Sequence, residues 1–270
     1  MKTNEHRNEE SEQAPPKKRG FFLPVFMLCL IAVAVTLYVK RDEWKIDEII
    51  TGSSEVEATP TPDPIKYEVL KKQLADERLL LRKRYLAAKT TQEQDAVISD
   101  TSALLEHTMP ELMRCWLGHP WDFNGTATVP GEGKIACGYF VSTIMRDTGF
   151  GVKRIKLAQQ PSQRIIKTFV PRKKMWIKAG MPYDKYADKL QSDYDGINIV
   201  GLDKHVAFVV IKNGKLHFIH SGGIQRLVVD ELRPDAYALR VSNYRVIGNI
   251  SKNRDLLLKW ILDQPFPTAK

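Results

Sequence analysis

One cysteine and two histidines have the residue types and the surroundings that acyl-transfer chemistry needs. Cys137 begins an apolar stretch with helical spacing, so it lies at or near a helix N-terminus. There the helix dipole and the free N–H groups favour a thiolate over a thiol. A thiolate nucleophile also needs a base, and histidine is its usual partner; His205 and His220 are the candidates. Each residue alone also fits an ordinary role, as a buried small side chain or a hydrogen-bonded strand histidine.

The two histidines become more informative once the strands that carry them are placed. The β-rich runs 205–211 and 216–220 are separated by Asn213-Gly214, a strong signal for a type I′ hairpin turn. Such a hairpin puts the start of the first run beside the end of the second, so His205 and His220 should lie close together. His217 should point to the opposite face of its strand.

Four short motifs, in order along the chain, resemble those of the NlpC-type cell-wall endopeptidases (the NlpC/p-sixty superfamily), which have a papain-like fold. Residues 118–125 (Gly-His-Pro-Trp-Asp-Phe-Asn-Gly) resemble the stretch that begins the family's catalytic domain. Residues 136–141 (Ala-Cys-Gly-Tyr-Phe-Val) resemble its nucleophile motif. Residues 205–209 (His-Val-Ala-Phe-Val) and 218–221 (Phe-Ile-His-Ser) resemble its two histidine strands.

The resemblance implies roles for particular residues. Cys137 would be the nucleophile, His205 the base, and His220 the group that orients the base. Trp121 and Asp122 would bind substrate, with Trp121 where the family usually has a tyrosine. It further implies an α+β, papain-like fold, in which the nucleophile helix packs on an antiparallel β-sheet, and a cysteine peptidase or amidase that needs no cofactor and no metal.

The sequence also departs from the family pattern. Ala136 stands where the family usually has Asp, and Gly138 where it has Ser. About fifty residues, 149–197, are inserted before the first histidine strand. These departures bear on the substrate more than on the thiol chemistry.

Two helical segments and a stalk precede this region. Residues 40–64 are expected to form a stalk, because the alternating prolines near its end favour extended polyproline II. Residues 65–117 read as a helical extension of two segments, 65–89 and 92–117, with Pro110 kinking or restarting the second. The catalytic domain then spans 118–270, with further strands at 226–229 and 244–250 and a last helix capped by Ser251.

Residues 20–39 carry no charge and are long enough to cross a bilayer at about 1.5 Å per residue. We expect an uncleaved transmembrane helix; a signal peptide would have a shorter apolar core. The lysine and arginine bias of residues 1–19 predicts a cytoplasmic N-terminal tail and an extracytoplasmic catalytic domain.

The chain has 270 residues and a net charge of +9, with 43% hydrophobic and 27% charged residues. These fractions exclude a mostly disordered chain, and three cysteines are too few for a disulfide scaffold. Residues 153–178 are basic and free of acidic side chains, and offer a surface to anionic polymers or lipid headgroups. Nucleic acid is not expected as a partner, because no binding motif accompanies the charge. Cys29 falls in the apolar segment, and Cys115 is expected to be a buried free thiol.

The sequence thus predicts a single-pass, membrane-anchored cysteine hydrolase that cleaves an amide bond, with cell-wall peptides as the expected substrate. Two alternatives stay open at this stage. The same thiol site can serve an esterase or amidase that acts on lipid or another acyl group, or the domain can be a non-catalytic wall-binding module.

Overall fold

The computed structural model describes residues 59–222 and 224–270, and Thr59–Lys270 form one compact unit. The predicted cytoplasmic tail, the apolar segment 20–39 with Cys29, and most of the predicted stalk lie outside the described residues. Within the described part of the chain, no helix has the length and apolar character that crossing a bilayer requires.

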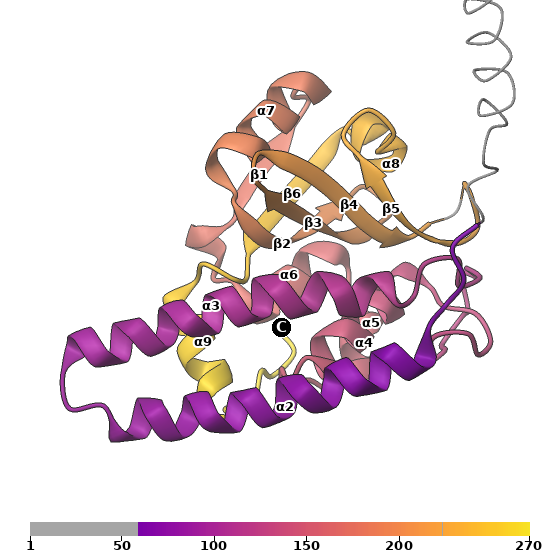
Figure 1. The fold of residues 1–270 in the computed structure, drawn as a ribbon. Coiled ribbons are helices and arrows are strands. Elements are labelled where there is room, and N and C mark those ends of the chain that lie inside the picture. Colours follow the sequence, from indigo (N-terminus) through magenta and orange to yellow (C-terminus); the bar gives the residue numbers. More distant parts are fainter. Residues whose placement is uncertain (1–58, 223) are drawn as a thin grey trace, which may run out of the picture. The chain divides into compact units, whose positions relative to one another are not determined.

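The unit combines helices with one six-stranded sheet (Figure 1). The helices are α2 (Pro64–Ala87), α3 (Thr91–Arg114), α4 (Cys137–Asp147), α5 (Arg154–Ala158), α6 (Ser162–Phe169), the 3-10 turn η1 (Arg172–Lys174), α7 (Tyr183–Asp193), α8 (Tyr237–Val241) and α9 (Arg254–Ile261). The strands are β1 (Trp176–Ala179), β2 (Gly196–Leu202), β3 (Val206–Lys212), β4 (Lys215–Ser221), β5 (Val228–Leu232) and β6 (Tyr244–Asn249).

The sheet has the order β1-β6-β2-β3-β4-β5, and every neighbouring pair is antiparallel. The predicted α+β class with an antiparallel sheet is therefore confirmed. The hairpin between β3 and β4 turns at Asn213 and Gly214, which have φ angles of 52° and 69°. These positive values are those that a type I′ turn requires.

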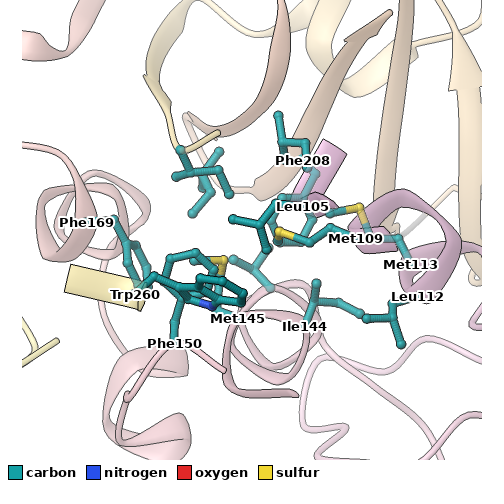
Figure 2. Close-up of a cluster of buried hydrophobic side chains, with 14 of the residues drawn as sticks. Leu105, Met109, Leu112, Met113, Ile144, Met145, Phe150, Phe169, Phe208 and Trp260 are labelled. Atoms are coloured by element: carbon teal, nitrogen blue, oxygen red, sulfur yellow. The ribbon is translucent and has the colours of Figure 1, made fainter. Parts of the chain in front are cut away.

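Helices cover both faces of the sheet. Figure 2 shows α3 residues such as Leu105 and Met109 meeting Ile144 and Met145 of α4, with Trp260 of α9 nearby, in one buried cluster. This cluster lies between the sheet and α2, α3, α4, α6 and α9. A second cluster on the other face is closed by α7 and α8, through side chains such as Leu190 and Leu239. The helix α4, which begins at Cys137, thus packs on the sheet within the larger core.

The helical extension forms part of the same unit. Tyr67, Leu74 and Leu81 of α2 are buried in the cluster that also contains α4. The helix α3 runs through Pro110 without a break, so the predicted restart there is wrong. Pro110 is itself buried, and packing of its ring against the core offsets the hydrogen bond that proline cannot donate.

Several boundaries differ from the sequence prediction. The strand β5 begins at Val228 and ends at Leu232, two residues later than expected at its start and three at its end. Asn253 occupies the N-cap position of the last helix without a side-chain capping hydrogen bond, so Ser251 does not cap it. The Ser251 hydroxyl instead donates to Glu106 Oε1 at 2.7 Å and accepts from the Ile197 N–H at 2.9 Å. The inserted residues 149–197 form α5, α6, η1, α7 and the edge strand β1.

Candidate functional site

Cys137 is the first residue of α4, as predicted from the sequence. The preceding residue, Ala136, has extended backbone angles (φ −83°, ψ 158°), and no side chain caps the helix. No N-cap side chain therefore accepts from the N–H groups of the first turn. Backbone N–H groups of Cys137, Gly138 and Val206 point to the sulfur and each act to lower the pKa of the thiol.

The two predicted histidines meet at the open end of the β3–β4 hairpin. The His205 Nε2 and His220 Nδ1 atoms are 3.0 Å apart, and the ring planes are nearly perpendicular, at 84°. His205 immediately precedes β3, whereas His220 lies near the end of β4. The sequence prediction of their proximity is confirmed. His217 was expected to point to the opposite face of its strand, and its Nδ1 lies 2.9 Å from Asp230 Oδ1, away from the other two histidines.

A buried carboxylate continues the chain of contacts beyond His220. Glu231 of β5 is 8% exposed, and its Oε2 lies 3.3 Å from His220 Nε2. The other oxygen, Oε1, accepts a hydrogen bond of 2.7 Å from the side-chain amide of Gln225. Sequence reasoning missed Glu231. The predicted strand ended at residue 229, before Glu231, and only the pairing of β4 with β5 shows which histidine this carboxylate reaches.

Burial controls the charge state of Cys137 and His205. Desolvation raises the pKa of Cys137 above its ordinary value, against the opposing effect of the backbone N–H groups. Desolvation, together with the charge of His220, lowers the pKa of His205 to about 3. The free site at neutral pH therefore holds a neutral thiol beside a neutral imidazole. The helix dipole alone does not produce the thiolate that the sequence suggested.

Cys137 and His205 line a cleft with two arms. One arm, of about 530 Å³, is lined by Trp121, Phe123 and Tyr139 in addition to the reactive pair. The second arm has a volume of about 260 Å³. In addition to Cys137 and His205 it is lined by non-aromatic residues, which include Ser162, Ile165, Leu202, Asp203 and Val206. Both arms reach Cys137 and His205, and an extended substrate has room in each of them.

The structure separates the two predicted substrate-binding residues. Trp121 lines the aromatic arm of the cleft beside Cys137, as expected. Asp122 lines neither arm. Its Oδ1 accepts from the Asn124 N–H at 2.9 Å and its Oδ2 lies 3.7 Å from Lys134 Nζ, so it stabilises the turn that follows Trp121.

Cations flank the aromatic arm. The Arg226 guanidinium lies 5.7 Å from the centroid of the Trp121 ring. Lys204 lines both arms. Within residues 59–222 and 224–270, neither cation forms an ion pair with a carboxylate, so both are available to an anionic group on a ligand.

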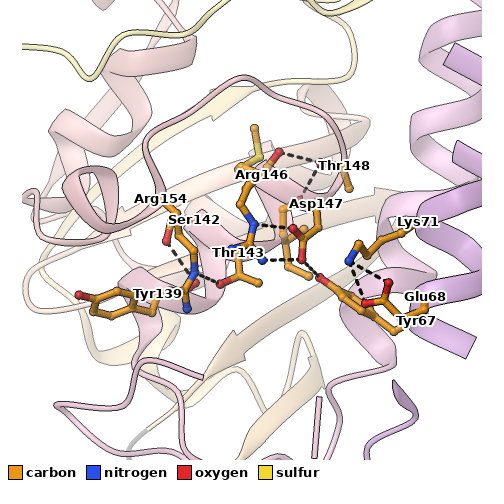
Figure 3. Close-up of polar contacts among 12 residues, drawn as sticks. Tyr67, Glu68, Lys71, Tyr139, Ser142, Thr143, Arg146, Asp147, Thr148 and Arg154 are labelled. Atoms are coloured by element: carbon orange, nitrogen blue, oxygen red, sulfur yellow. Dashed lines mark hydrogen bonds and ion pairs between the residues drawn. The ribbon is translucent and has the colours of Figure 1, made fainter. Parts of the chain in front are cut away.

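A polar network holds α4 against its neighbours (Figure 3). The Tyr67 hydroxyl of α2 donates to Asp147 Oδ2 at 2.9 Å at the end of α4. Arg154 at the start of α5 donates to Thr143 Oγ1 at 2.7 Å and stacks over the Tyr139 ring at 4.9 Å. These contacts fix α4 to both α2 and α5.

The second described cysteine has no part in the cleft. Cys115 is buried and free, as predicted, and burial raises its thiol pKa to about 11. In the described ranges, no three His, Cys, Asp or Glu side chains are grouped to hold a metal ion.

Comparison with known proteins gives no further identification: no family model, no curated protein and no solved structure matches this chain.

Proposed function

We propose that this chain is a papain-like cysteine hydrolase that cleaves an amide bond, with cell-wall peptide as its substrate class. The observation that carries the proposal is the hydrogen bond of 3.0 Å between His205 Nε2 and His220 Nδ1. It occupies one nitrogen of His205 and leaves Nδ1 as the nitrogen that can act on Cys137, which lines the same cleft. The motif resemblance to NlpC-type endopeptidases supports the same assignment.

In the proposed reaction, His205 Nδ1 takes the proton of the Cys137 thiol as the sulfur attacks the amide carbonyl carbon. The resulting imidazolium donates that proton to the leaving amine as the C–N bond breaks. Water, deprotonated by His205, then hydrolyses the thioester, which releases a carboxylic acid and restores the thiol. Because both groups start neutral, the proton moves during attack rather than before it.

Backbone N–H groups at the start of α4 can stabilise the oxyanion of the tetrahedral intermediate. Ala136 provides no side-chain cap that would compete for these donors. Such donors are worth about 3–4 kcal/mol of transition-state stabilisation each in well-studied hydrolases.

The walls of the cleft support a peptide with acidic groups as the substrate. Trp121, Phe123 and Tyr139 offer apolar contact, and Lys204 and Arg226 offer charge to a carboxylate on one side of the scissile bond. Wall peptides bear such free carboxylates. If residues 20–39 anchor the chain and residues 1–19 stay cytoplasmic, the cleft would face the wall, and the basic residues 153–178 would add an attraction for anionic polymers or headgroups.

The test incubates the full-length protein, in detergent, with purified wall peptides and separately with phospholipid vesicles. Release of a new amine from wall peptide, abolished by Cys137→Ala and retained by Cys115→Ala, is the expected result. Release of fatty acid from the vesicles alone would replace wall peptide by a lipid substrate. If Cys137 is alkylated by iodoacetamide no faster than Cys115, and nothing is hydrolysed, the domain is a non-catalytic binder and the proposal is wrong.

A further inference from the structure

The buried carboxylate of Glu231 contacts His220, and the proposed catalytic groups do not include it. We propose that Glu231 is a positioning residue that sets the protonation pattern of both imidazoles, so that His205 presents a lone pair to Cys137. The inference rests on the proposed function, and it adds a fourth group to the Cys137–His205–His220 arrangement.

When Glu231 is ionised and both histidines are neutral, the contacts from Glu231 through His220 to His205 allow only one assignment of protons to the ring nitrogens. A carboxylate only accepts, so His220 Nε2, at 3.3 Å, must carry its proton. A neutral His220 then has a bare Nδ1, which accepts from the His205 Nε2–H at 3.0 Å. A neutral His205 in turn has a bare Nδ1. The carboxylate thus determines which nitrogen of His205, two rings away, is left without a proton.

The surroundings of Glu231 fit this role. Its side chain is almost fully buried, at 8% exposed, and within the described ranges it forms no ion pair with a lysine or arginine. A buried carboxylate without a cation is costly unless donors satisfy it. His220 and Gln225 are the two donors, one for each oxygen. The negative charge then gains a favourable partner when the proton of Cys137 reaches His205.

The proton balance of the step is simple. The S–H bond of Cys137 breaks and an N–H bond forms at His205 Nδ1. The Nε2–H of His205 and the Nε2–H of His220 stay in place as donors. No proton needs to reach Glu231, whose charge stabilises the imidazolium through the intervening ring.

The neighbouring residue of β5 provides a matched control. Asp230 is also a carboxylate bonded to a histidine, with its Oδ1 2.9 Å from His217 Nδ1, and it pairs with Arg114 at 3.0 Å. Because side chains alternate along a strand, it lies on the opposite face of β5 and does not touch the catalytic histidines. Asp230→Asn makes the same chemical change as Glu231→Gln outside the site.

The experiment uses full-length protein, nitrogen-15 spectra of the histidine rings at neutral pH, and the rate of Cys137 alkylation by iodoacetamide, followed by peptide mass spectrometry. In the wild type, His205 and His220 should both carry the proton on Nε2. Glu231→Leu should shift His220 toward the Nδ1–H form and slow alkylation by on the order of 10²-fold, as expected for a wrong tautomer. Glu231→Gln, which keeps an acceptor without the charge, should cause a smaller loss, and Asp230→Asn none.

Either of two results would overturn the inference: an Nδ1–H form of His205 or His220 in the wild type, or an alkylation rate that Glu231→Gln and Glu231→Leu both leave unchanged. The wild-type spectrum decides the matter even if Glu231→Leu does not fold. Failure of the proposed function has a different signature, because alkylation of Cys137 would then be slow in the wild type and insensitive to His205→Asn.

Discussion

The α-carbon of Gly222 lies directly against the imidazole of His220. A Cβ atom at Gly222 would lie 2.3 Å from Cε1 and 2.6 Å from Nδ1 of that ring, closer than real Cβ contacts come. The Nδ1 atom is the one that meets His205. The absence of a side chain at residue 222 is therefore what lets His220 reach the orienting position.

Gly222→Ala should displace the His220 ring and lower the rate of hydrolysis and of Cys137 alkylation by about 10²-fold, the usual result of a misplacement near 1 Å. Because Gly222 lies just after the end of β4, the fold should survive. Thermal unfolding followed by circular dichroism is the control, and it should stay near that of the wild type. A variant with normal alkylation and normal melting would contradict the argument.

Gly138 explains one departure from the family pattern. A Cβ at this position would lie 2.4 Å from the carbonyl oxygen of Ala158, where α5 approaches the start of α4. The serine that the family has at the corresponding position does not fit here without a backbone shift.

Gly138→Ser should therefore destabilise the protein by about 1–3 kcal/mol, as overpacking of a close contact does. It should also lower activity, because Cys137 is the adjacent residue. Urea unfolding and hydrolysis of the substrate are the two measurements. A gain of activity without loss of stability would show that α5 can move away at little cost.

Trp121 and Asp122 give a test of the cleft itself. Trp121→Ala should raise the KM for wall peptide about tenfold or more, with a smaller effect on kcat, because the ring lines the aromatic arm without taking part in the chemistry. Asp122→Asn should leave KM nearly unchanged, since that side chain stabilises a turn. Equal effects of the two substitutions on KM would show that the loop matters only as a whole.

The pH dependence of stability follows from two buried histidines. Burial lowers the pKa of His119 to about 4, and burial with the charge of His220 lowers that of His205 to about 3. Both pKa values are about 6.5 in the unfolded chain. The unfolded state thus binds more protons below about pH 6.5, and stability falls as the pH falls, by up to about 1.4 kcal/mol per pH unit for each histidine.

His119→Asn should remove the contribution of one histidine while its side-chain oxygen replaces Nδ1 as the acceptor for the Gly131 N–H, at 2.9 Å in the wild type. Urea unfolding at several pH values between about 4 and 7 measures the slope. A variant whose stability falls as steeply as that of the wild type would mean that His119 is not neutral in the folded state.

Local sequence signals predicted the parts that form within a few residues. Asn213 and Gly214 turn the hairpin because both adopt positive φ, and this alone placed His205 near His220. The apolar spacing after Cys137 placed it at the start of α4, and the α-helical periodicity of residues 65–89 predicted α2 to within two residues at its C-terminal end. Residues that are close together in the sequence determine these features, through their backbone preferences and their turn geometry.

Other features required the tertiary structure. Glu231 reaches His220 only because β5 pairs with β4 in one register, and the acidic residue before it, Asp230, points the other way. Ser251 binds Glu106 and the β2 backbone, partners that are remote in sequence. Asp122 accepts a hydrogen bond within its own turn, because the geometry of that loop places the Asn124 N–H beside it.

The sequence by itself determined the candidate nucleophile, the two histidines and the hairpin that joins them. The tertiary structure decided which carboxylate supports them, which aromatic side chain lines the cleft, and the charge state of the thiol and the imidazole. The physical reason is that strand register and burial depend on packing between distant segments. Once Cys137 and His205 are enclosed, desolvation outweighs the hydrogen bonds from backbone N–H groups to the Cys137 sulfur.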